Sequence, residues 1–127
     1  MRVRLSPPQL VVGTSEPAVV FFDVERRLPV AATQVHQDDV NAMCYAGGCD
    51  PNIVVSGSDD TLLRVFDRRM VDGTGSAGPV GGLPGHTEGV THLHGRDDGR
   101  YILSNGKDQT ARLWDLRGMV PAAEMRK

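Results

Sequence analysis

The chain has 127 residues, enough for one domain or for a piece of a larger protein. Its 14 basic and 16 acidic residues give a net charge of −2 without any block of like charge. This balance excludes the basic surface that binds nucleic acid or an anionic membrane, so we expect no direct nucleic-acid or membrane partner. The longest purely apolar run, residues 18–22, is far too short to cross a bilayer.

Two features of the composition indicate where the protein works. Pro7, Pro8 and Gln9 interrupt the apolar stretch that a secretory leader needs. Cys44 and Cys49 do not make a disulfide framework, and in a reducing compartment we expect free thiols, with Cys44 in the core. We therefore expect a soluble intracellular protein, in the cytoplasm, the nucleus or both.

Short runs of β-branched and apolar residues alternate with polar turns, and helical spacing of apolar residues is absent. The first unit, residues 9–25, has strands on either side of a turn at Ser15–Pro17 and ends in Phe22-Asp23. Two sets of three strands are expected next, at residues 40–46, 52–57 and 62–67, and at residues 90–94, 100–105 and 110–115. The pattern predicts an all-β chain.

The glycine-rich stretch between these sets, residues 71–82, contains a G-x-G-x-x-G motif from Gly73 to Gly78. A dinucleotide-binding fingerprint needs a helix directly after its third glycine. Pro79, Gly81, Gly82 and Pro84 follow instead, and none of them supports a helix. We interpret the stretch as a linker through a poor outer strand, and we expect no nucleotide or other cofactor.

The two sets of strands belong to an internal repeat. Residues 36–69 align with residues 86–117, and the equivalent pairs are His36 with His86, Val40 with Val90, Ser56 with Ser104, Asp60 with Asp108, and Phe66-Asp67 with Trp114-Asp115. Repeats of about 40–45 residues that carry Gly-His and Trp-Asp are typical of four-stranded propeller blades. We divide the chain into a partial, decayed blade at residues 1–35, a blade at 36–85, and a blade at 86–127 that includes the start of the next outer strand.

These motifs resemble the WD-repeat family over residues 9–117, and more narrowly the cullin-4-associated factors similar to plant LEC14B-type proteins. The most specific segment is "SNGKDQT" at residues 104–110 followed by "LWDLR" at 113–117. The resemblance implies WD-repeat β-propeller blades in an incomplete ring, about two and a half of an expected seven or so. It further implies a substrate receptor that docks on the damage-specific DNA-binding adaptor of a cullin-4 ubiquitin ligase and presents a ubiquitination substrate.

Adaptor docking in that family is associated with a W-D-x-R box. Trp114-Asp115-Leu116-Arg117 matches the box in full, whereas the equivalent positions in the preceding repeat keep only Asp67 and Arg69 and have Phe66 as the aromatic residue. An arginine just beyond a strand end projects at the blade rim, where its planar fork can bind carboxylates or carbonyls of a partner. The alternative is a surface arginine paired with its neighbouring aspartate.

A Ser/His/Asp set occurs in each repeat and has two interpretations. By resemblance, His86, Ser104, Asp108 and Trp114 form a structural tetrad, in which aspartate binds histidine, histidine binds serine, and serine binds the indole N–H. His36, Ser56 and Asp60 repeat it without the indole, because Phe66 has no N–H. The alternative, a propeller hydrolase, requires an exposed serine beside an oxyanion hole. We favour the structural interpretation and expect no catalytic residues.

His92 and His94 alternate on an expected strand, near Asp97 and Asp98. A metal site needs three or four ligands in a defined shell, so we expect no metal here. The leading interpretation is thus a protein-interaction module without an active site, and the alternative is a WD-repeat scaffold unrelated to a ligase. About two and a half blades do not close a ring of roughly 4–8, so the chain is interpreted as a fragment, a truncated product or a self-assembling unit, of which we favour the fragment.

Overall fold

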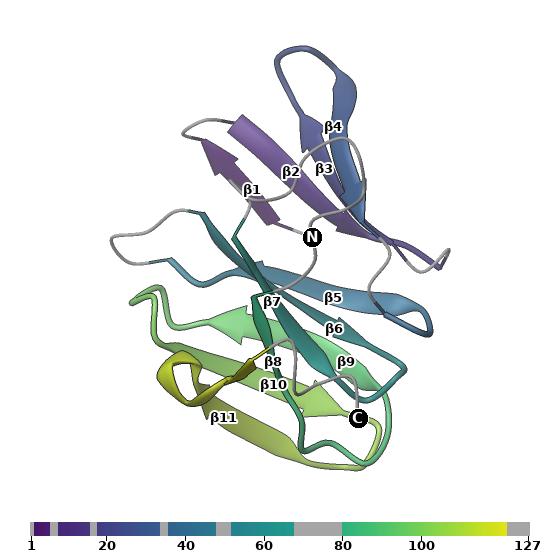
Figure 1. The fold of residues 1–127 in the computed structure, drawn as a ribbon, viewed down its shortest axis with the longest axis vertical. Helices are drawn as coiled ribbons and strands as arrows, with labels where there is room; N and C mark the ends of the chain where they lie inside the picture. The colour runs from purple at the N-terminus through teal and green to yellow at the C-terminus, as the bar shows by residue number, and fades with distance from the viewer. Residues whose placement is uncertain are drawn as a thin grey trace.

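Three antiparallel β-sheets lie side by side in the computed structural model of the chain (Figure 1). The structure describes residues 2–5, 8–15, 18–33, 36–47, 52–67 and 80–121. Apart from the last strand of the chain, which joins the second sheet, each sheet is formed by strands that follow one another in the chain. This is the arrangement of successive propeller blades. Three such sheets leave the ring open, since propellers close with about 4–8 blades.

The first sheet has four strands in the order β1-β2-β3-β4. Its strands are β1 (Arg2–Leu5), β2 (Pro8–Gly13), β3 (Val19–Asp23) and β4 (Leu28–Thr33). The sequence predicted only the end of a blade from residue 9 onward, and the structure adds β1, which pairs antiparallel with β2. The turn between β2 and β3 is closed by a hydrogen bond from the Thr14 N–H to the Ala18 carbonyl at 3.0 Å.

The second sheet contains the strands that the sequence predicted, within about one residue at each end. They are β5 (Val40–Tyr45), β6 (Ile53–Ser58), β7 (Leu63–Asp67) and the short outer strand β8 (Gly81–Leu83). The predicted poor outer strand is thus present. Residues 68–79, with the G-x-G-x-x-G motif and Arg69, lie outside the described residues, as does Cys49.

The third sheet has three strands, again close to their predicted positions. They are β9 (Val90–Gly95), β10 (Tyr101–Gly106) and β11 (Ala111–Asp115), in the order β11-β10-β9. A short 3-10 helix, η2 (Leu116–Gly118), follows β11. Asp98 shapes the turn before β10, because its carboxylate accepts the Arg100 and Tyr101 N–H groups at 2.9 and 3.0 Å.

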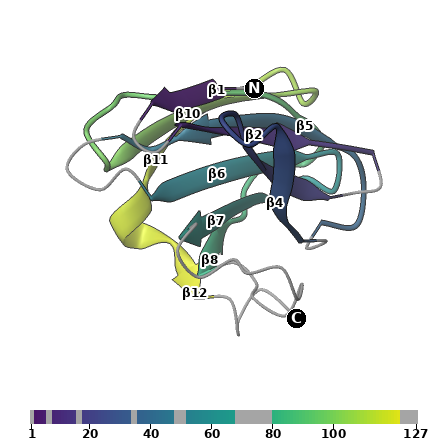
Figure 2. The same ribbon diagram turned by 90° about the horizontal axis from the view of Figure 1, so that it is seen from above.

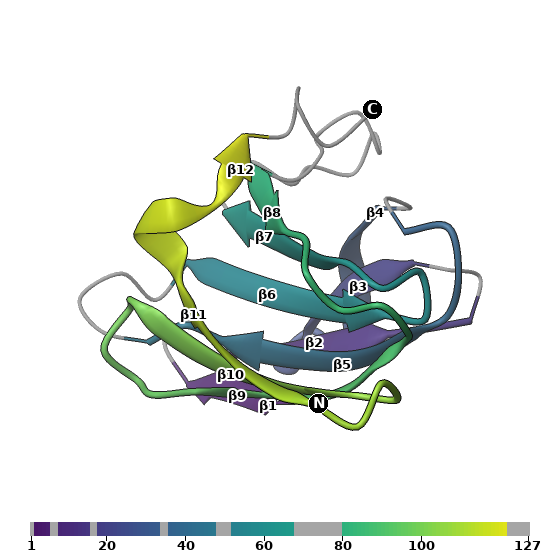
Figure 3. The ribbon, with the colours of Figure 1, turned by 90° about the horizontal axis from the view of Figure 1, so that it is seen from below.

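The C-terminal segment lies in a different place from the one the sequence predicted. Residues beyond 117 were expected to start the next outer strand, but β12 (Val120–Pro121) pairs antiparallel with β8 of the second sheet (Figure 3). Helix η2 turns the chain back, and its buried Leu116 packs between the second and third sheets together with Met119. β12 thus extends the edge of the second sheet, and β11 remains an edge strand of the third sheet.

The core consists of two apolar layers, each between neighbouring sheets. The first and second sheets enclose a layer that includes Phe21, Tyr45 and Phe66, and the second and third sheets enclose another that includes Leu63, Leu93 and Ile102. The middle sheet is therefore buried on both faces (Figure 2 gives the view from above). The outer face of the third sheet exposes Leu103 and Leu113. Among the described residues, no helix has the length and apolar character needed to span a membrane.

Candidate functional site

A chain of hydrogen bonds runs through the third sheet and brings together four residues singled out in the sequence. The His86 Nδ1 lies 2.9 Å from Asp108 Oδ2, and the His86 Nε2 lies 2.7 Å from Ser104 Oγ. The indole Nε1–H of Trp114 donates to the same serine oxygen at 2.7 Å. Because an ionised carboxylate only accepts, the Nδ1 carries the proton, so in the neutral ring Nε2 accepts from the serine hydroxyl.

Asp108 lies at the end of this chain of hydrogen bonds, and its carboxylate is surrounded by hydrogen-bond donors. The Thr110 hydroxyl and N–H bind one carboxylate oxygen, and His86 and the Thr87 N–H bind the other. These bonds, with the Thr110 hydroxyl as the largest contribution, hold the pKa of Asp108 well below its ordinary value despite the opposing effect of burial. Asp108 therefore ties the loop before β9 to the turn between β10 and β11.

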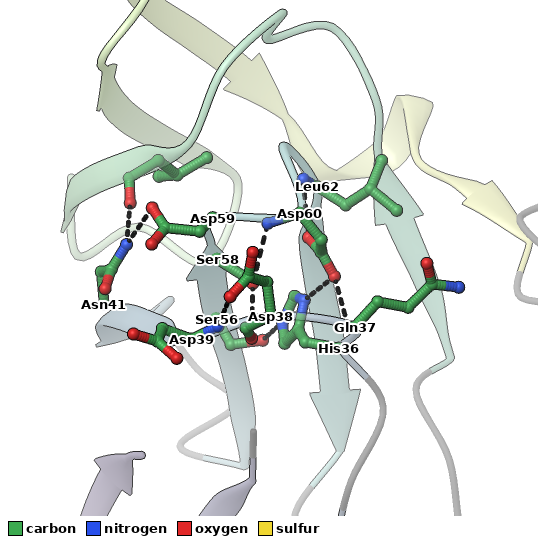
Figure 4. A network of polar contacts seen from close by, with 11 residues as sticks. His36, Gln37, Asp38, Asp39, Asn41, Ser56, Ser58, Asp59, Asp60 and Leu62 are labelled. Atoms are coloured by element: carbon green, nitrogen blue, oxygen red, sulfur yellow. Dashed lines mark hydrogen bonds and ion pairs between the residues drawn. The ribbon is translucent and has the colours of Figure 1, made fainter. Parts of the chain in front are cut away.

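The second sheet contains the same chain of hydrogen bonds from aspartate to histidine to serine, but without the indole donor (Figure 4). His36 Nδ1 lies 2.9 Å from Asp60 Oδ2, and His36 Nε2 lies 2.6 Å from Ser56 Oγ. Phe66 stands at the position of Trp114, is fully buried, and has no polar hydrogen to offer Ser56. Burial would raise the pKa of Asp60, but hydrogen bonds from His36 and the Gln37 N–H outweigh it and hold the pKa below its ordinary value.

Both serines lie where a nucleophile could not reach a substrate. Ser56 and Ser104 have 0% of their surface exposed. The Ser104 oxygen already accepts from the Trp114 indole. Nucleophilic attack needs a serine open to substrate beside an oxyanion hole, so this geometry supports the structural interpretation over the hydrolytic one.

The W-D-x-R box lies where β11 passes into η2. Three of its four side chains are held by the fold: the Trp114 indole binds Ser104, the Asp115 carboxylate caps η2 by accepting the Arg117 N–H at 3.0 Å, and Leu116 is buried. The fourth, Arg117, has 67% of its side chain exposed, with its Nε 3.5 Å from Asp115 Oδ1. The box therefore presents one arginine to the surface.

The related positions of the second repeat are described only in part. Asp67 is the last residue of β7, whereas Arg69 lies outside the described residues. The structure also adds Arg100, which the sequence analysis did not single out, as an ion-pair partner of Asp115. The contact follows from the strand register, which sets Tyr101 opposite Asp115 and places Arg100 next to this pair.

Two sets of candidate metal ligands can be compared with the structure. Neither His92 nor His94, both exposed, belongs to a group of three or more metal-binding side chains within the described parts of the chain. Asp38, Asp39 and Asp59 do bring their carboxylates within 4.8 Å of one another. Asp59 is already bound by Lys107 at 2.8 Å, and this hydrogen bond lowers the pKa of Asp59 and raises that of Lys107. The acidic group is thus compensated by a lysine of the next sheet.

The family described as "WD domain, G-beta repeat" matches residues 28–67 and 77–115, more than half of the chain. A LEC14B protein from Lithospermum erythrorhizon is 43% identical over 111 residues, which cover 87% of this chain and 23% of that protein. A Caenorhabditis elegans protein named "DDB1- and CUL4-associated factor 11 homolog" is 45% identical over 113 residues, which cover 88% of this chain and 19% of that protein. The chain thus spans about a fifth to a quarter of the curated relatives it matches.

Solved structures agree with the sheet arrangement. A chain in the crystal structure of the mitotic checkpoint complex aligns with a TM-score of 0.74 and 27% identity, covering 90% of this chain and 33% of that one. A chain of a humanized mutant Polycomb Repressive Complex 2 from Chaetomium thermophilum also aligns with a TM-score of 0.74, at 28% identity. From the repeated sheets and the family match, the chain belongs to the WD-repeat family, with LEC14B and DDB1- and CUL4-associated factor 11 proteins among its relatives.

Proposed function

We propose that this chain is a protein-interaction module of a substrate receptor, and that it docks on the damage-specific DNA-binding adaptor of a cullin-4 ubiquitin ligase. The observation that carries the proposal is the box at residues 114–117, in which the fold holds three side chains and Arg117 extends from the surface. The nematode relative is named for the same adaptor and cullin.

Arg117 has the chemistry that this role requires. A guanidinium presents a planar fork of N–H donors, which binds carboxylates and backbone carbonyls with defined geometry. The Arg100 guanidinium binds the other oxygen of the neighbouring Asp115 carboxylate, and the Arg117 guanidinium has only a long contact of 3.5 Å to Asp115. The guanidinium therefore keeps donors available for an acidic or carbonyl-rich surface of the adaptor.

The proposal also states where the module would act and what else it would bind. The module would act inside the cell, in the cytoplasm or nucleus, and would bind a ubiquitination substrate through rim loops or through segments outside this chain. It would have no active site of its own and need no cofactor or metal. Nucleic acid would not be a direct partner, since the charge of −2 is spread without a basic block.

The test is capture of the purified adaptor by the chain and by an Arg69→Glu/Arg117→Glu variant. Arg26→Glu is the matched control, because Arg26 has a similarly exposed side chain and a similar contact to a neighbouring aspartate, Asp23, at 3.8 Å. Charge reversal at an interface arginine should weaken capture at least about tenfold, whereas the control should bind like the unchanged chain. Circular dichroism on all three confirms that the strands are formed.

Each outcome has a defined meaning. Arginine-dependent capture by a folded chain supports the receptor. Absence of capture by a folded chain contradicts the proposal and leaves a WD-repeat scaffold of another assembly. Capture that both double variant and control retain would assign adaptor binding to a different surface.

A further inference from the structure

Arg100 contacts the docking box from the turn that precedes β10. Its Nε and Nη2 donate to the Oδ2 of Asp115 at 3.2 and 3.1 Å. The Arg100 carbonyl also accepts the Leu116 N–H at 2.8 Å. One residue thus binds both the side chain of the second box position and the backbone of the third.

The carboxylate of Asp115 divides its two oxygens between two arginines. Oδ2 is bound by Arg100, and Oδ1 accepts the Arg117 N–H at 3.0 Å and lies 3.5 Å from the Arg117 Nε. Arg100 therefore holds one oxygen of the carboxylate whose other oxygen contacts Arg117. The side chain of Arg100 is 40% exposed and that of Asp115 is 35% exposed, so water competes for the pair but does not surround it.

Arg100 is itself held in place by its neighbours. Its guanidinium lies over the Tyr101 ring, 4.8 Å from the ring centroid, at a distance typical of a cation–π contact. Its N–H binds the Asp98 carboxylate, which shapes the turn. Arg96 also lies over Tyr101, at 5.7 Å, but its ion-pair partner is Asp98 at 3.6 Å and not Asp115.

We propose that Arg100 is a positioning residue for adaptor docking: it holds Asp115 so that Arg117 projects at the rim in the orientation that the partner reads. This inference rests on the proposed function. It also distinguishes the two repeats, because β6 pairs Ile53 with Asp67 and the residue before Ile53 is Asn52. A neutral amide cannot supply the charged fork of an arginine, so the box of the third sheet should be the dominant one.

The test compares the adaptor affinity of Arg100→Gln, Arg100→Lys and Arg96→Gln chains by surface plasmon resonance. Arg100→Gln should weaken binding about fivefold, the upper range for a partly exposed ion pair, whereas Arg96→Gln should bind like the unchanged chain. Arg100→Lys should recover part of the loss, because it keeps the charge but loses the fork. In an Arg117→Ala background, Arg100→Gln should have no further effect.

Additive losses in the double variant would overturn the proposal, because they would mean that Arg100 contacts the adaptor directly. An unchanged affinity for Arg100→Gln would overturn it too. Circular dichroism checks that each variant is folded. If Arg100→Gln is unfolded, the affinity of Arg100→Lys is measured instead, alone and in the Arg117→Ala background, and an unchanged affinity or additive losses would again overturn the proposal.

A second measurement separates this inference from the proposed function. Hydrogen exchange of the Arg117 amide should be about fivefold faster in Arg100→Gln and unchanged in Arg96→Gln, because its acceptor Asp115 loses its support. If the unchanged chain does not bind the adaptor, the proposed function fails, whereas faster exchange would still show that Arg100 positions the box. Equal exchange in all chains would overturn the positioning role itself.

Discussion

The two hydrogen-bond chains differ by a single donor. Ser104 lies between the imidazole of His86 and the indole of Trp114. Ser56 binds the imidazole of His36, and the position equivalent to Trp114 is the buried Phe66, which has no polar hydrogen. A buried polar group that loses its partner costs about 1–3 kcal/mol. The same substitution should therefore have different effects in the two sheets.

We expect Ser104→Ala to lower the free energy of unfolding by about 2–4 kcal/mol and Ser56→Ala by about 1–2 kcal/mol. The first change leaves two polar groups without their partner and the second leaves one. Urea denaturation followed by circular dichroism measures both. Equal losses would show that the indole N–H of Trp114 contributes nothing to stability.

Asp108 makes stability depend on pH in the acid range. Its folded pKa lies below the ordinary value of 3.8, so the folded chain binds fewer protons than the unfolded chain as pH falls through this range. The stabilisation is fully present above the ordinary value and is lost as pH drops toward the folded pKa. We expect Asp108→Asn to be less stable at neutral pH and to lose less stability on acidification, measured by urea titrations between pH 7 and pH 2.

Glu88→Gln is the matched control for this experiment, since Glu88 is an exposed carboxylate in the same loop region. It should retain the acid dependence of the unchanged chain. An acid dependence unaltered by Asp108→Asn would mean that other carboxylates, such as Asp60, govern the transition.

Packing between neighbouring sheets depends on a close approach at Gly57 in β6. A Cβ placed there would lie 2.6 Å from Val90 Cγ1 and 3.1 Å from Val90 Cβ, which belong to β9 of the next sheet. Both partners lie within extended strands, so neither can move away without shifting its sheet. The small residue thus sets the distance between the second and third sheets.

Gly57→Ala should destabilise the chain by about 1–3 kcal/mol through overpacking. Gly118→Ala is the matched control, because no atom lies within 4 Å of the Cβ it would add. It should change the free energy of unfolding by less than about 0.5 kcal/mol. Thermal or urea denaturation measures both, and a tolerated Gly57→Ala would mean that the two sheets separate more easily than the packing indicates.

The strands themselves follow from local sequence. Short runs of β-branched and apolar residues between polar turns predicted β5, β6, β7, β9, β10 and β11 within about one residue, because such runs favour the extended backbone. The pairings of β1 and β12 did not follow in this way. Which partner an edge strand finds depends on which edge is unpaired nearby, and that is a property of the folded sheet.

Burial is distributed unevenly among the three sheets. The middle sheet is covered on both faces, whereas β11 is the edge of a sheet whose outer face exposes Leu103 and Leu113. Repeat arrays gain stability mainly from contacts between neighbouring units. The middle unit has two such contacts, whereas the first and third units have one each. Local opening should therefore begin in the outer sheets and not in the middle one.

Native-state hydrogen exchange tests this expectation. Hydrogen-bonded amides of β6 should exchange about tenfold or more slowly than those of β11, because β6 opens only when both of its interfaces are lost. Equal protection of the two strands would show that the three sheets unfold as one cooperative unit.

The sequence by itself determined the all-β character and most strand positions, because apolar runs, turn chemistry and an internal repeat are all local or periodic patterns. The members of the two hydrogen-bond chains were expected from the resemblance to the WD-repeat family. Burial of both serines, exposure of Arg117, the placement of β12 beside β8 and the role of Arg100 were decided by the tertiary structure. Each of these depends on residues brought together from different strands. Arg100 reaches Asp115 only because β10 and β11 pair in the register that sets Tyr101 opposite that aspartate.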